Sequence, residues 1–255
     1  MKNYTKGILS SIGFILIWLL IQVIFVFIFE IISMASGNFN REIMYMLCEI
    51  TTIFIYYLIF KGREYTLKDR CSFKKISMKS LFKLILVVIG ISILSVTLIE
   101  MLNSFFPSYE EAMQDLVSSS IIINFINFVI IAPVFEEILF RGIILYNLKK
   151  YINIYSAIII QSVLFSIMHG NVLQGIYTMI LGIILGLIRY WTGSLWATII
   201  SHMIFNFLGS MIIIEIYTNL IFVYMIIGLL LTIIPLYYIY RDFKNKNNKE
   251  LNMLN

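Results

Sequence analysis

Charged residues are scarce in this chain of 255 residues: Asp, Glu, Lys and Arg make up 13% of it, roughly half their share in a typical soluble domain. Apolar residues make up 60%, and the mean hydropathy is +0.93. This composition excludes a soluble globular protein and predicts an integral membrane protein, with the lipid bilayer as its surroundings. The net charge is +5. Because the distribution of charge matters more than its sum in a membrane protein, we expect no nucleic-acid partner.

Cysteine is nearly absent as well. Cys48 lies in an apolar run and Cys71 in a basic loop, so neither a disulfide framework nor a cysteine metal cluster is supported. Alternating segments of about ten residues, which a membrane β-barrel needs, are also missing.

What the chain has is a series of apolar runs, most of them about 18 to 25 residues long, as a helix needs to cross about 30 Å of hydrocarbon. They lie at residues 8–32, 43–60, 81–102, 121–149, 154–168, 172–190, 195–214 and 220–240. The first run follows Lys2 and Lys6, as in a secretion signal, but it is too long for a cleaved signal. We therefore predict an all-α fold, a polytopic membrane helix bundle with about eight transmembrane helices.

The expected domain organisation is simple. Residues 1–240 form one transmembrane bundle, with a motif-bearing core at about 120–214, and residues 241–255 form a polar basic tail. The loop at residues 61–79 carries seven Lys or Arg residues against two acidic ones, and such loops face the cytoplasm. The loop after the third run carries only acidic charges, Glu110, Glu111 and Asp115. This pattern predicts that both termini are cytoplasmic.

The fourth run holds the strongest anomaly, the stretch from Ala132 to Gly142 with Glu136, Glu137 and Arg141 inside it. Ionised groups at membrane depth are costly and mark functional sites by default. Glu137 and Arg141 are four residues apart and share a helical face, so they can form an ion pair. Glu136 points about 100° away and is left without a cation on its own helix. Glu30, Glu49 and Glu100 are scattered near span ends, where single carboxylates need no function.

Both histidines of the chain lie in apolar runs: His169 ends the fifth, and His202 lies in the seventh, four residues before Asn206. His202 and Asn206 therefore present hydrogen-bond donors from one helical face. A carboxylate and an imidazole can deprotonate a water, while a second imidazole and an amide can stabilise an oxyanion. These are the parts of a peptide-bond hydrolase.

Three short motifs follow one another along the chain, each in a separate run: Glu136-Glu137-x-x-x-Arg141, Phe165-x-x-x-His169 and His202-x-x-x-Asn206. In this the chain resembles the CAAX protease and bacteriocin-processing family, intramembrane glutamic endopeptidases similar to the prenyl-protein endopeptidase Rce1. The resemblance covers roughly residues 135–207 and implies an eight-helix bundle with a water-accessible cavity.

The resemblance also implies residue roles. Glu136 is expected as the general base, with His169 helping to activate the water, and His202 and Asn206 as the oxyanion hole. Glu137 and Arg141 are expected to order the site or to contact the substrate. Catalysis is expected to need no metal or other cofactor, and the substrate is expected to be a membrane-associated peptide or protein. The compact chain looks like the bacterial branch of the family, which does not favour a prenylated CAAX substrate.

Three other interpretations compete with a protease. Two His and a Glu can hold zinc, although the His-Glu-x-x-His arrangement is absent. A non-catalytic immunity or regulatory protein could keep the same scaffold. A proton-coupled transporter could use intramembrane Glu and His as a relay, but it should show an internal repeat of spans, which the sequence lacks.

Two expectations concern packing. Thr178, Gly182 and Gly186 form a stripe of small residues that favours close helix packing over chemistry. Counted at about 1.5 Å per residue from the nearest cytoplasmic turn, Glu136, His169 and His202 lie about 20, 27 and 10 Å deep. We expect helix tilt and a break at Pro133 to bring them to one depth.

Overall fold

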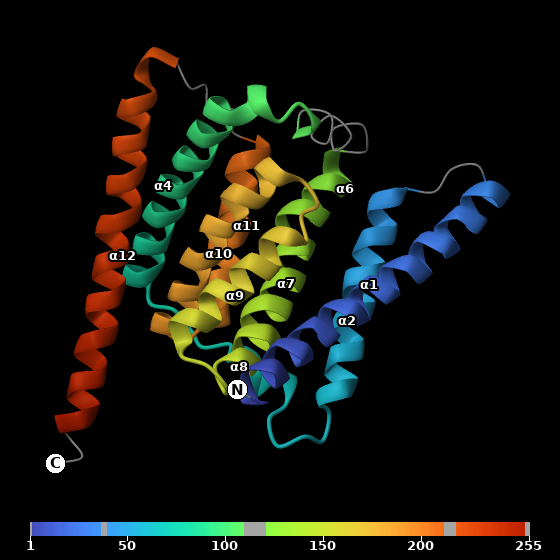
Figure 1. Ribbon diagram of the computed structural model, residues 1–255, viewed down its shortest axis with the longest axis horizontal. Helices are drawn as coiled ribbons and strands as arrows, with labels where there is room; N and C mark the ends of the chain where they lie inside the picture. Colours follow the sequence, from blue (N-terminus) through green and yellow to red (C-terminus); the bar gives the residue numbers. More distant parts are fainter. Residues whose placement is uncertain (1, 37–39, 110–120, 212–217, 253–255) are drawn as a thin grey trace. The chain divides into compact units, whose positions relative to one another are not determined.

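The computed structural model describes residues 2–36, 40–109, 121–211 and 218–252, and every regular element among them is a helix (Figure 1). The long helices are α1 (Lys2–Ser36), α2 (Arg41–Phe60), α4 (Met78–Leu102), α9 (Ile154–Ile167), α10 (Val172–Thr192), α11 (Leu195–Met211) and α12 (Ile221–Asn252). The predicted acidic loop with Glu110, Glu111 and Asp115 lies outside the described residues, as does the end of the seventh run.

Within the described residues, five helices are long and apolar enough to cross a membrane: α1, α2, α4, α10 and α12. Two more expected spans, α9 and α11, are shorter apolar helices. The predicted all-α membrane helix bundle is thus confirmed, and the protein is an integral membrane protein. The polar segment after residue 240 continues as part of α12 to Asn252.

The fourth apolar run is helical but irregular. It consists of α6 (Ile121–Phe125), a π-helix η2 (Ile126–Ile131), α7 (Ala132–Glu137), a second π-helix η3 (Ile138–Ile144) and α8 (Leu145–Leu148). The amide of Ala132 bonds to the carbonyl of Asn127, and that of Leu145 to Phe140, so both bonds span five residues.

Pro133 explains the first π-helix. Proline has no amide hydrogen, and its ring would clash with the carbonyl of Val129 in a regular α-helix. A wider π turn before the proline moves that carbonyl aside. The expected break at Pro133 is therefore wrong: the backbone stays helical on both sides, and the irregularity is spread over two π segments that flank Glu136 and Glu137.

The chain divides into two compact units, and the first comprises Met1–Ser72 with Glu111–Gln161. In it α2 packs against α1, η2 and α7. The hydroxyl of Tyr56 donates to the carbonyl of Phe14 at 2.7 Å, and Asn127 donates to Glu42 at 3.0 Å. These contacts fix the register of α2 against the preceding helix α1 and against η2 of the fourth run.

The basic loop at residues 61–79 adds a short helix, α3 (Leu67–Cys71), which packs against η3. Arg70 lies over the rings of Phe60 and Tyr146, 4.1 and 4.7 Å from their centroids, and donates to Asn147 at 2.8 Å. Burial is the main cause that lowers the pKa of Arg70, and the aromatic faces offset part of that desolvation. These contacts hold Arg70 against α8, at the end of the fourth run.

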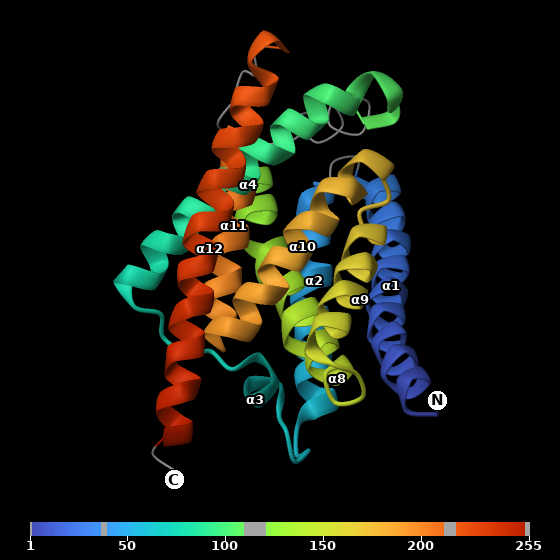
Figure 2. The same cartoon turned by 60° about the vertical axis from the view of Figure 1, so that its left-hand side comes forward.

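The second unit comprises Phe73–Glu110 and Ser162–Asn255. Figures 1 and 2 show α12 alongside α4. A Cβ on Gly90 of α4 would lie 2.5 Å from Oγ1 of Thr232 and 2.8 Å from the carbonyl of Gly228 in α12. The two backbones meet here, which only glycine permits.

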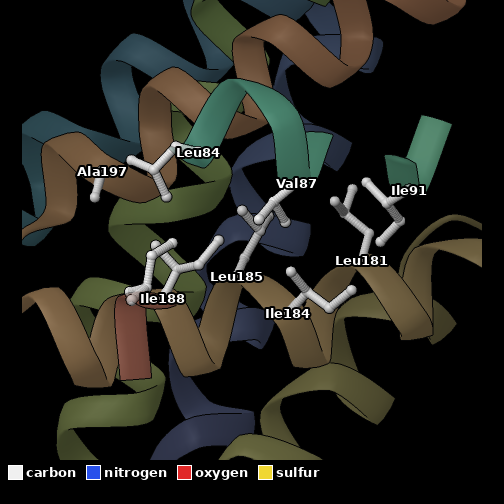
Figure 3. Close-up of a cluster of buried hydrophobic side chains, with 9 residues drawn as sticks. Leu84, Val87, Ile91, Leu181, Ile184, Leu185, Ile188 and Ala197 are labelled. Carbon is white, nitrogen blue, oxygen red and sulfur yellow. The ribbon is translucent and has the colours of Figure 1, made fainter. Parts of the chain in front are cut away.

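The core of the second unit is an apolar cluster between α4 and α10, joined by Ala197 of α11 (Figure 3). Its remaining members include Leu84, Val87, Ile91, Leu181, Ile184, Leu185 and Ile188. The opposite face of α10 carries Gly182, where a Cβ would lie 3.0 Å from the side chain of Ser162. The small-residue stripe therefore serves packing at Gly182, as predicted. The prediction of a single bundle over residues 1–240 stays a prediction.

Candidate active site

Glu137 and Arg141 form a buried ion pair in the first unit. Nη1 of Arg141 donates to Oε1 of Glu137 at 2.7 Å, and both side chains are inaccessible to solvent. Glu137 ends α7, and Arg141 follows within η3. The pairing predicted from their spacing is confirmed. Removing one member of such a pair leaves a buried charge, at a cost of about 3–5 kcal/mol.

Glu136 also lies on α7, and it is half-buried. Its neighbour Phe135 is buried against the ring of Trp18, with the centroids 5.3 Å apart, and this contact holds α7 against α1. Glu136 interacts electrostatically with Arg141 and with Glu49 of α2. The carboxylate therefore lies within reach of both a cation and a second acid.

Glu49 is the residue that the sequence reasoning missed. It was expected near a span end, but it is the ninth residue of the 20-residue helix α2, so that prediction is wrong. Glu30 and Glu100 are exposed, as expected for carboxylates without a function. The signal that could have separated Glu49 from them is its depth along its own span.

The histidines lie in the second unit, and both contact one aromatic ring. The centroid of Phe165 lies 4.8 Å from that of His169 and 5.9 Å from that of His202, and both contacts are edge-on. Phe165, a position of the second motif, is thus a common neighbour of the two imidazoles. The structure thus brings together two residues that are 33 positions apart in the sequence.

His169 lies in the turn that follows α9, beside Gly170, whose φ of +71° favours glycine. Nδ1 of His169 lies 2.9 Å from the carbonyl oxygen of Phe165. Because a carbonyl only accepts, Nδ1 carries a proton, and in a neutral ring Nε2 holds the lone pair. A neutral His169 can therefore accept a proton or a hydrogen bond through Nε2.

His202 and Asn206 lie one turn apart on α11. His202 is buried, with 2% of its surface exposed, and Asn206 is half-buried. The preceding Ser201 donates to the carbonyl of Ala197 at 2.7 Å, so its hydroxyl is used within its own helix. The two polar residues that the third motif singles out on α11 are therefore His202, with its imidazole, and Asn206, with its amide.

The six predicted residues fall into two groups. Glu136, Glu137 and Arg141 lie together in the first unit; His169 and His202 lie together in the second unit, with Asn206 on the helix of His202. Within either unit, the described residues contain no group of three His, Cys, Asp or Glu side chains arranged for a metal. Chemically, the first group offers a base beside a fixed ion pair, and the second offers an imidazole acceptor and two donors.

The model of the type II CAAX prenyl endopeptidase Rce1-like family matches residues 118–208. This segment contains all six predicted site residues, from Glu136 to Asn206, and leaves the first three long helices outside. Comparison with curated proteins and with solved structures gives no match. The resemblance indicated by the three motifs is confirmed by the family match: residues 118–208 are similar to the Rce1-like family, a CAAX type of membrane protease, and they lie within an integral membrane protein.

Proposed function

We propose that the chain is an intramembrane glutamic endopeptidase that hydrolyses peptide bonds without a metal. Glu136 takes a proton from water, assisted by Nε2 of His169, and the resulting hydroxide attacks the peptide carbonyl. His202 and Asn206 donate hydrogen bonds to the oxyanion. The proton then passes to the leaving amine as the C–N bond breaks, and the base is restored.

The observation that carries this proposal is the different surroundings of the two neighbouring acids on α7. Glu137 is held by Arg141 at 2.7 Å in a dry site, whereas Glu136 is half-buried one residue earlier. A permanently paired carboxylate is a poor base, and a carboxylate next to a fixed cation stays ionised. The ion pair thus supports Glu136 as the group that meets water.

The arrangement in the second unit supports the remaining roles. The tautomer of His169 leaves Nε2 as an acceptor, as a partner of the base requires. Buried donors on a regular helix, as His202 is on α11, stabilise developing charge well because they need little reorganisation. The mechanism requires the carboxylate of Glu136 and the imidazole of His169 to share one water.

The substrate class follows from the surroundings. The five long apolar helices of the described residues support a membrane-associated peptide or protein as the substrate, with the lipid bilayer as the medium. The basic segments at residues 61–79 and after residue 240 support cytoplasmic termini, and we assign the protein to a bacterial cell membrane. A prenylated CAAX end is not the substrate we favour.

The test is a comparison of peptides released from membranes that contain either the wild type or Glu136→Gln. Peptides present only with the wild type are expected, and their ends give the cleavage site. Equal release by a folded Glu136→Gln variant would exclude the glutamic mechanism. A phenotype that survives this variant without any released peptide would favour the non-catalytic immunity or regulatory protein.

A second arm tests zinc. The purified protein is treated with EDTA or 1,10-phenanthroline and assayed on the released peptides' parent sequences. Unchanged cleavage is expected, because the proposed base and oxyanion donors are side chains. Loss of cleavage with recovery on adding Zn²⁺ would contradict a metal-independent reaction.

A further inference from the structure

Glu49 is a carboxyl group that the proposed mechanism does not use, although it lies in the middle of α2. Its Oε2 atom is buried and has no hydrogen-bond partner among the described residues. A buried oxygen without a partner is costly, and it is more costly for an anion than for a neutral acid. Its surroundings therefore favour a protonated Glu49.

The packing of α2 places this group at the level of Glu136. Asn127 donates to Glu42 at 3.0 Å, and α2 packs against both η2 and α7. Figure 1 shows α2 running in the same direction as the helices from α6 to α8. Glu49 lies two turns beyond Glu42, about 10 Å along the axis. Glu136 lies nine residues beyond Asn127, a similar distance along its own helix. Glu49 and Glu136 accordingly interact electrostatically.

The charges around the two acids differ. Glu49 is acted on by two carboxyls, Glu136 of α7 and Glu42 of its own helix, and the adjacent Cys48 is a buried thiol. Glu136 is acted on by the cation of Arg141 as well. Glu137, the other acid of α7, is paired with that cation, and η2 contributes the neutral Asn127. Two acids thus act on Glu49, whereas Glu136 has the cation of Arg141 among its neighbours.

We propose that Glu49 and Glu136 form a coupled pair that holds one proton at neutral pH, with the proton on Glu49 and the negative charge on Glu136. Two nearby carboxyls in an apolar site do not both ionise and titrate as a unit. Glu49 is then a positioning residue that keeps the neighbourhood of the base free of a second negative charge. This inference rests on the proposed role of Glu136, but the pair itself can be tested without proteolysis.

The experiment uses the full-length protein in detergent and dicyclohexylcarbodiimide, an apolar reagent that modifies protonated carboxyls. Labelling at Glu49, Glu136 and Glu30 is measured by mass spectrometry between pH 5 and 9. We expect Glu49 to react fastest at neutral pH and Glu136 to be protected. Glu30, an exposed acid on α1, reports a carboxyl without this partner.

The decisive variant is Glu136→Gln, with Glu136→Ala as a second form in case the first does not fold. Removing the negative partner should shift the loss of labelling at Glu49 to lower pH by about one unit or more. Glu30→Gln is the matched control and should leave the Glu49 profile unchanged. An unchanged profile in both Glu136 variants would overturn the pair, and so would a Glu49 that reacts no faster than Glu30 at every pH.

The two proposals fail in different ways. If the labelling shift is found while the Glu136→Gln variant still releases peptides, the coupled pair stands and the glutamic mechanism fails. If cleavage is lost but the labelling profile does not shift, the mechanism stands and the pair fails.

Discussion

The first unit holds buried charges in an irregular helix, whereas the second unit carries uncharged polar groups on regular helices. In the first, Glu137 and Arg141 neutralise each other within a run interrupted by two π-helices. In the second, hydroxyls such as those of Ser201 and Thr232 bond to carbonyls of their own helices. Removing one member of the buried ion pair should therefore lower the free energy of unfolding strongly, whereas removing one of these hydroxyls should lower it little.

The largest effect should come from breaking the ion pair of the first unit. Arg141→Met leaves Glu137 buried without its cation and should lower the free energy of unfolding by about 3–5 kcal/mol. The double variant Glu137→Gln/Arg141→Met should recover most of the loss, because no buried charge remains. Unfolding in mixed detergent micelles measures both.

The second unit supplies the matched control, the ion pair between Lys83 and Asp242, which is partly exposed. Lys83→Ala should change the free energy of unfolding by less than about 1 kcal/mol. If Lys83→Ala and Arg141→Met lower the free energy of unfolding equally, burial does not explain the difference between the two ion pairs.

The next effect concerns turnover and not stability. Asn206→Ala should lower kcat by about 10² to 10³ with little change in KM, since the amide is proposed to act on the transition state. Ser201→Ala, whose hydroxyl bonds only to Ala197 in its helix, is the control and should retain full activity. A rise in KM with kcat unchanged would show that Asn206 only binds substrate.

A smaller effect should follow from the close packing of α4 on α12. Gly90→Ala places a Cβ 2.5 Å from Thr232, and such overpacking costs about 1–3 kcal/mol. Gly13→Ala in α1 meets nothing within 4 Å and should be neutral or slightly stabilising. Thermal unfolding of the two variants compares them; equal melting temperatures would contradict backbone contact at Gly90.

The smallest effect should be at the cap of α3. Thr66 and Asp69 form a capping box, and the hydrogen bonds from Thr66 lower the pKa of Asp69. An acid whose pKa is lowered by folding stabilises the fold at pH values above its ordinary pKa near 3.9. This stabilisation is lost as the pH falls through the lowered pKa. Thr66→Ala should weaken the cap by roughly 1 kcal/mol.

Pepsin cleavage of the loop at residues 61–79 measures this cap at acid pH. The wild-type loop should become more sensitive as the pH falls below about 4, whereas the loop of Thr66→Ala should be sensitive already. Lys68→Ala, on the same short helix, should behave as the wild type. A pH-independent difference between Thr66→Ala and the wild type would contradict the role of Asp69.

Hydropathy predicted the helices well because crossing a bilayer requires long apolar segments, and spacing predicted the pair of Glu137 and Arg141 because four residues make one turn. The π-helices were not predictable, because the way a helix accommodates Pro133 depends on its neighbours. Glu49 was missed for a related reason. Its place opposite Glu136 is set by packing of α2 against residues 85 positions away, as Glu42 and Asn127 show.

The identity of the base is the most direct point to measure. Purified wild type and Glu136→Gln, both shown to be folded by thermal unfolding, are incubated in lipid vesicles with the same membrane peptide, and product is quantified by mass spectrometry. The glutamic mechanism predicts cleavage by the wild type and none above the uncatalysed background by the variant. Cleavage by Glu136→Gln at a rate close to that of the wild type would contradict it.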